Sequence, residues 1–158
     1  MKKIDPANWT PFFMKRKERF CVEVLERMNG AMQDALSEGD LHAAAHCADK
    51  LCEGLMKLTG SVSRERYAPM LYTYSYLLAQ IAMFGVGGER GLAAGLPPLQ
   101  DAYDFARECE SGGFGNSEKV ASDVRLIGGI ITDIESGRPL EEIKDEYCPD
   151  FPENLIRR

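Results

Sequence analysis

Residues 40–58 read DLHAAAHCADKLCEGLMKL, and this stretch decides the fold class. Its apolar side chains recur at steps of 3, 4, 3, 4 and 3 residues, at Leu41, Ala44, Ala48, Leu51, Leu55 and Leu58. This spacing places them on one side of an α-helix, where they can pack on a neighbouring helix. Asp40 is a suitable cap before the first turn, and Gly60 is a suitable stop after the last. The stretch therefore predicts an amphipathic helix between these two residues.

The same helical spacing extends to both sides of this stretch. Upstream, we expect an irregular lead-in over residues 1–9 and a helix over 11–37 that Thr10 caps. Downstream, another helix opens at Ser61 or Ser63. Its apolar residues step by 4, 3, 4 and 3 along Tyr67, Leu71, Tyr74, Leu78 and Ile81. Further apolar residues widen this face, so we expect this helix to be the central and most buried element.

The second half of the chain adds three predicted helices. They span about 97–110, 118–136 and 139–147, and residues 148–158 follow them as an extended tail. Glycines and prolines fill residues 85–98, so we expect that segment to be an irregular, flexible connector.

Two adjacent glycines, Gly128 and Gly129, lie in the middle of the predicted helix over 118–136. Each costs about 1 kcal/mol relative to alanine in a helix interior. Such a cost predicts the close approach of another helix backbone, or a large side chain resting on this point.

The fold class follows from these stripes and from the composition. The chain has 158 residues, of which 44% are hydrophobic and 28% are charged, which suits one soluble domain with a real core. No segment shows the alternation of a β-strand. We therefore expect an all-α, mostly antiparallel bundle over residues 1–158, with five main helices and a short C-terminal helix.

Charge and cysteine content narrow the function classes. The net charge of −6 argues against general nucleic-acid binding, which needs a concentrated basic face. The longest apolar stretch, Tyr76 to Gly88, is too short for the ~20 residues of a transmembrane helix. Asp5 and Pro6 interrupt the place of a secretory signal. The five cysteines form no CxxC pair, so we expect free thiols in the cytoplasm.

The start of the chain is a basic and aromatic exception. Its cations are Lys2, Lys3, Lys15, Arg16, Lys17 and Arg19, and its aromatic residues are Trp9, Phe12 and Phe13. A solvated helix face and a staple onto the core explain these residues structurally. Contact with a membrane surface or a nucleic acid is the functional alternative.

Two segments have small residues in a pattern found in a known helical family. Residues 39–45 read GDLHAAA, and residues 99–106 read LQDAYDFA. Both resemble the start of the second helix of a tetratricopeptide repeat, where small residues pack against the preceding helix. The resemblance implies antiparallel helical hairpins. The chain departs from the family in two respects. Ala44 and Ala102 lie 58 residues apart, not a multiple of the repeat of about 34 residues, and the family's first-helix pattern of tryptophan, leucine, glycine and tyrosine is absent before Gly39.

A candidate metal site lies on the predicted helix of residues 40–58. His42, His46, Asp49 and Glu53 fall within a stripe roughly 60° wide, at about 100° per residue, opposite the leucines. Two imidazoles at positions i and i+4 with a carboxylate can chelate zinc or another divalent ion. A polar outer face that contains two histidines by chance is the structural alternative.

A candidate interaction surface rests on five tyrosines: Tyr67, Tyr72, Tyr74, Tyr76 and Tyr103. Tyrosine has an apolar ring and a polar tip, so it suits pockets and interfaces. Packing at the edge of the core is the structural alternative.

Catalytic patterns are weak in this sequence. Residues 85–91 read GVGGERG, which lacks the ending of a phosphate-binding loop and follows a predicted helix. Cys47 is adjacent to His46, so the two side chains point about 100° apart on a helix. We therefore expect a non-catalytic protein-interaction module, an adaptor, chaperone-like or regulatory protein that binds a protein or peptide or forms a homodimer. The alternative is a bundle that binds a metal or small ligand through His42 and His46.

Overall fold

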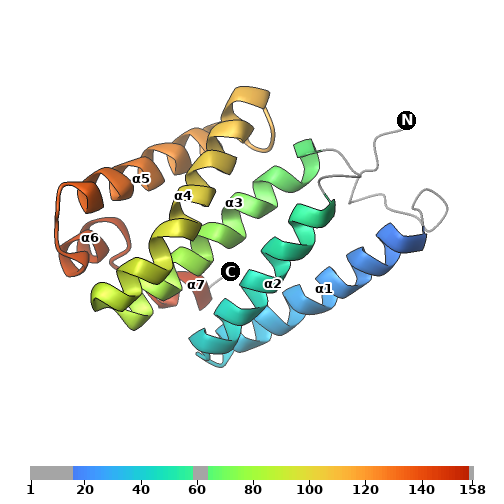
Figure 1. Ribbon diagram of the computed structural model, residues 1–158, viewed down its shortest axis with the longest axis horizontal. Coiled ribbons are helices and arrows are strands. Elements are labelled where there is room, and N and C mark those ends of the chain that lie inside the picture. Colours follow the sequence, from blue (N-terminus) through green and yellow to red (C-terminus); the bar gives the residue numbers. More distant parts are fainter. Residues whose placement is uncertain (1–15, 59–63, 157–158) are drawn as a thin grey trace.

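The computed structural model describes residues 16–58 and 64–156, and every regular element in these ranges is a helix (Figure 1). The expected all-α class is therefore confirmed. The elements are α1 (Arg16–Ser37), α2 (Leu41–Leu58), α3 (Arg64–Gln80), the π-helix η2 (Ile81–Val86), α4 (Gly88–Gly112), α5 (Ser117–Glu135), α6 (Leu140–Tyr147) and α7 (Glu153–Ile156).

The first five α-helices lie side by side in the order of the sequence, each packed on its neighbours (Figure 1). The most extensive contact joins α3 to α4. The C-terminal part of the chain turns back behind this row, and α7 reaches α1 (Figure 1). The fold is therefore a bundle whose two halves meet at α3.

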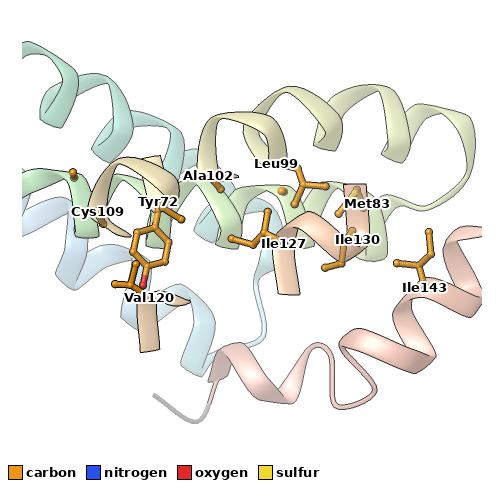
Figure 2. Close-up of a cluster of buried hydrophobic side chains, with 12 residues drawn as sticks. Tyr72, Met83, Leu99, Ala102, Cys109, Val120, Ile127, Ile130 and Ile143 are labelled. Carbon is orange, nitrogen blue, oxygen red and sulfur yellow. The ribbon is translucent and has the colours of Figure 1, made fainter. Parts of the chain in front are cut away.

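Two buried clusters form the core, and α3 with η2 contributes to both. The first cluster joins α3, η2, α4, α5 and α6, and Figure 2 shows its side chains between Cys109 at one end and Ile143 at the other. The second cluster joins α1, α2, the C-terminal end of α3 and the C-terminal residues of the chain. This double role agrees with the broad apolar face that marks the central helix in the sequence.

The expectation of an irregular connector over residues 85–98 is wrong. Helix α4 begins at Gly88 instead of near residue 97, and only the short turn at Gly87 and Gly88 has positive φ angles, of 73° and 62°. A Cβ atom on Gly91 would lie 2.7 Å from the carbonyl oxygen of Ala82. The glycines therefore allow the backbones of α4 and η2 to approach closely, and this contact outweighs their low helix propensity.

Helix α4 also contains Pro97 and Pro98 in its interior. Proline has no amide hydrogen, so the carbonyls of Ala93 and Ala94 receive no bond from them. Both alanines are exposed, so water can satisfy these carbonyls. The helix tolerates two prolines because their cost falls on the solvent side.

The prediction for the C-terminal end of the chain can be compared with the structure, whereas the prediction for the first residues cannot. The tail over 148–158 is not extended, because residues 153–156 form α7 and the side chains of Phe151 and Leu155 are 7% and 1% exposed. The lead-in over 1–9 and the cap at Thr10 lie outside the described residues, as do the side chains of the basic and aromatic start.

The expectation for the glycine pair in α5 is confirmed. A Cβ atom on Gly128 would lie 3.1 Å from the ring of Tyr103, and one on Gly129 would lie 2.9 Å from the hydroxyl of Tyr147. Two large side chains, one from α4 and one from α6, therefore rest on α5 where it lacks side chains.

The close contact at Gly91 predicts opposite effects for two glycine-to-alanine substitutions. We expect Gly91→Ala to lower the free energy of unfolding by about 1–3 kcal/mol, because the new methyl group meets the backbone of η2. Gly30 lies inside α1, where a Cβ atom meets nothing within 4 Å. Gly30→Ala should therefore raise that free energy by about 0.5–1 kcal/mol. Urea unfolding measures both changes, and equal effects would contradict the assigned contact.

Candidate functional site

One side of α3 has a stripe of residues that differs sharply between its two halves. Met70, Thr73, Leu77 and Gln80 step by 3, 4 and 3 residues, so they share one side of the helix. Met70 is 38% exposed and Thr73 is half-buried, whereas Leu77 and Gln80 are 0% and 2% exposed. The stripe is therefore open at the start of α3 and covered at its end.

The cover over the second half is the C-terminal segment, residues 147–156. Asn154 Nδ2 donates a hydrogen bond of 3.1 Å to Gln80 Oε1, and the hydroxyl of Tyr76 lies at hydrogen-bonding distance, 3.4 Å, from Cys148 Sγ. The ring of Phe151 meets that of Phe84 edge-on, with 5.8 Å between centroids. Leu77 lies in the same buried cluster as Phe151 and Leu155. The C-terminal segment therefore binds α3 and η2 through specific side chains.

The same segment contacts α5 at one end and α1 at the other. Tyr147 rests on Gly129 of α5 and donates a hydrogen bond of 3.0 Å to Asp133 Oδ2. At the other end, α7 packs on α1, and Leu155 lies in the cluster that contains Met32 and Leu36. The C-terminal segment thus crosses α5, α3 and α1 in turn, which Figure 1 shows as the path behind the row of helices.

Two tyrosine hydroxyls tie α3 directly to these same helices. Tyr72 donates a hydrogen bond of 2.8 Å to Asp123 Oδ2 on α5, and Tyr74 donates one of 3.0 Å to Asn29 Oδ1 on α1. Helices α1, α3 and α5 therefore share one side of the molecule, which we call the α1–α3–α5 side. On this side, α3 contacts the helices two places away in the row, α1 and α5.

The structure does not gather the five predicted tyrosines into one exposed surface. Tyr67 and Tyr72 are buried in the core. Tyr74 and Tyr76 are half-buried and border the α1–α3–α5 side. Tyr103 belongs to α4, rests on Gly128 and accepts a hydrogen bond of 3.2 Å from Arg107. Of the five tyrosines, Tyr74 and Tyr76 border this side, and an interaction role for the group stays a prediction from the sequence.

The four predicted metal ligands lie on the solvent side of α2. His42, His46, Asp49 and Glu53 are all exposed, and Glu53 accepts a hydrogen bond of 3.4 Å from Lys50. Within residues 16–58 and 64–156, no group of three or more His, Cys, Asp or Glu residues is arranged to hold a metal ion. Metal binding by α2 remains a prediction from the sequence.

The metal hypothesis predicts zinc binding at micromolar concentration in calorimetry at pH 7.5, with the heat lost in His46→Ala. Two imidazoles one turn apart must both contribute for a single helix to chelate the ion. A chain that releases no heat at this concentration would exclude the site.

Sequence reasoning missed a charged cluster that fixes the start of the C-terminal segment. Arg138, in the turn between α5 and α6, donates hydrogen bonds of 2.8 Å to both Asp133 and Glu146 and one of 3.4 Å to Glu142. The hydrogen bond from Arg138, followed by that from Tyr147, holds the pKa of the Asp133 carboxyl below its usual value. Burial, and then the bond to Asp133, raises the pKa of Tyr147 to about 12. A single arginine beside a glycine and a proline, amid six acidic residues, is the signal that could have revealed the cluster.

The lowered pKa of Asp133 predicts a loss of stability in acid. A carboxyl with a lowered pKa in the folded state stabilises the fold above its ordinary pKa of about 4 and loses this contribution as the pH falls further. The free energy of unfolding should therefore fall between about pH 5 and pH 2.5, and it should fall less steeply in Asp133→Asn. Urea unfolding across this range measures both slopes, and parallel slopes would contradict the assignment.

A shallow hollow of about 380 Å³ lies beside this cluster, between the start of α4 and the turn after α5. Leu92, Ile134, Leu140 and Arg138 are among the residues that line it, and the Nε and Nη1 atoms of Arg138 donate to carboxylates. The hollow is lined by neither α3 nor His46. It therefore does not supply the ligand pocket that the metal or small-ligand hypothesis requires.

Comparison of the chain with protein-family models, curated proteins and solved structures finds no match. Among the described helices, none combines the length and the apolar character needed to cross a membrane.

Proposed function

We propose that this protein is a protein-interaction module that binds an apolar segment of a partner on the α1–α3–α5 side. One observation carries the proposal: this side already binds a segment of the chain itself. The C-terminal segment crosses all three helices and buries Phe151 against η2 and Leu155 in the cluster that includes residues of α1 and α3. A surface that binds one short amphipathic segment has the chemistry to bind another.

The open half of the stripe on α3 supplies the place for the partner. Met70 is among the few large apolar side chains with substantial exposure in the described chain, and the half-buried Thr73 follows it on the same side. Methionine adapts its shape to different apolar partners. On α5, Asp123 accepts the hydrogen bond from Tyr72 and pairs with Lys119 at 2.7 Å, so the flank of α3 toward α5 is polar. An apolar centre with a polar rim is the usual anatomy of an interface.

Two further features support this proposal. Alternate helices meet on the α1–α3–α5 side, as in the stacked hairpins that the tetratricopeptide resemblance implies. The net charge of −6 favours a basic partner segment. The thiols of Cys47, Cys52, Cys109 and Cys148 are free, which supports a location in the cytoplasm.

Charge placed on the open half tests the proposal. Met70→Glu should reduce by about tenfold or more the amount of a partner captured from an extract of the source organism, because it puts a carboxylate at the apolar centre. Met56→Glu is the matched control, since Met56 is 48% exposed on α2 and should tolerate the same change. Quantitative mass spectrometry compares the captures, and circular dichroism checks that both variants fold. If the wild type and both variants capture the same amounts of every partner, the proposal is overturned.

A further inference from the structure

We propose that the C-terminal segment is a displaceable ligand held within the chain, and that the natural partner presents the same side-chain pattern. That pattern is an aromatic residue, then a side-chain hydrogen-bond donor three positions later and a leucine directly after it, as in Phe151, Asn154 and Leu155. This inference rests on the proposed function and identifies the kind of partner that the α1–α3–α5 side binds.

The way the segment is attached favours displacement. Its helix, α7, has only four residues and is too short to be stable by itself, so docking alone keeps it in place. Its anchors are the ring of Phe151 against Phe84 and the side chain of Leu155 against the cluster that includes Leu36. The contacts among α1, α2, α3, α4 and α5 do not involve the segment. It can therefore leave while the row of helices stays together.

Gln80 adds selectivity to the covered half. Its side chain is 2% exposed, its Oε1 accepts the hydrogen bond from Asn154, and its Nε2 donates one of 3.4 Å to the carbonyl of Tyr76. A buried amide oxygen is costly to leave without a donor. Any segment that replaces residues 151–155 must therefore supply a donor at the position of Asn154, which explains why the pattern includes a polar residue between two apolar anchors.

The open half of the stripe explains how a partner can displace the C-terminal segment. A tethered segment competes at a high effective concentration, so a partner that matched only its contacts would rarely displace it. A longer partner segment can cover Leu77 and Gln80 and also contact Met70 and Thr73, which the C-terminal segment leaves open. The additional contact area gives the partner an advantage that the tethered segment lacks.

A peptide of residues 149–156, PDFPENLI, provides the probe. Labelled peptide is titrated into the full chain and into the full-length double variant Phe151→Ala and Leu155→Ala, with fluorescence anisotropy as readout. The variant should bind the peptide about tenfold or more tightly than the wild type does, because its own segment no longer occupies the site. The peptide with alanine at both anchor positions should not bind. Val86→Ala, at an exposed apolar residue of η2, is the control chain and should behave as wild type.

Two results would overturn the inference: a folded double variant that does not bind the peptide, and equal affinities of wild type and variant. If circular dichroism shows that the double variant is unfolded, hydrogen exchange on the wild type decides instead. Amides of residues 153–156 should then exchange at least about tenfold faster than that of Leu77. Equal exchange rates would show that residues 153–156 detach only when the core unfolds, and this result would reject displacement.

The outcome is separable from that of the proposed function. If the double variant binds the peptide but Met70→Glu does not reduce partner capture, the C-terminal segment is displaceable and the open half is not a docking surface. If Met70→Glu reduces partner capture but the double variant does not bind the peptide, the protein is an interaction module and the C-terminal segment is not its resident ligand.

Discussion

The close approach of α4 to α3 and η2 is the contact on which the rest of the structure depends. At Gly91 and Gly95 helix α4 presents no side chain to α3 and η2, so the carbonyl oxygens of Ala79 and Ala82 and the side chain of Met83 lie next to the glycine backbone. This approach places Leu99, Ala102, Ala106 and Cys109 of α4 inside the first core. Because protein interiors are close-packed, side chains at these glycines would push α4 outward and leave a gap among α3, α5 and α6.

The central place of α3 follows from this contact and shapes the candidate site. Helix α3 packs on α4 and α2, and its tyrosines reach α5 and α1 on the flanks. The remaining side of α3 is the stripe of Met70, Thr73, Leu77 and Gln80, which alternates apolar and polar side chains. The C-terminal segment covers the end of this stripe and leaves Met70 open, so the fold and the proposed interaction surface have the same origin.

The sequence predicted those parts of the fold in which local pattern and tertiary packing agree. The helices over 40–58 and 118–136 have regular apolar stripes, and α2 and α5 match them closely. The glycine pair of α5 was also readable, because an uncompensated cost in a long helix implies a close neighbour. Residues 85–98 were misread because glycine has the same local signature in a flexible loop and in a close helix contact. The tail was misread because one helical turn is too short to show a period.

The candidate site was less predictable than the fold. The sequence pointed to tyrosines as a group, but a tyrosine stripe does not reveal which rings face the core and which border a surface. Tyr72 lies in the core, whereas Tyr74 bonds to a helix that is 45 positions earlier in the chain. The pairing of Gln80 with Asn154 joins residues 74 positions apart. No local pattern encodes such a distance.

The sequence by itself determined that the chain is all-α, where most helices lie and which of their faces are apolar, because these properties depend on the spacing of residues along one helix. The tertiary structure decided that a glycine-rich segment is helical, that α3 contributes to two cores, and that the C-terminal residues cover half of one stripe on α3. These outcomes depend on which helices meet in space, and the free energy of those contacts exceeds the local preferences of the residues concerned.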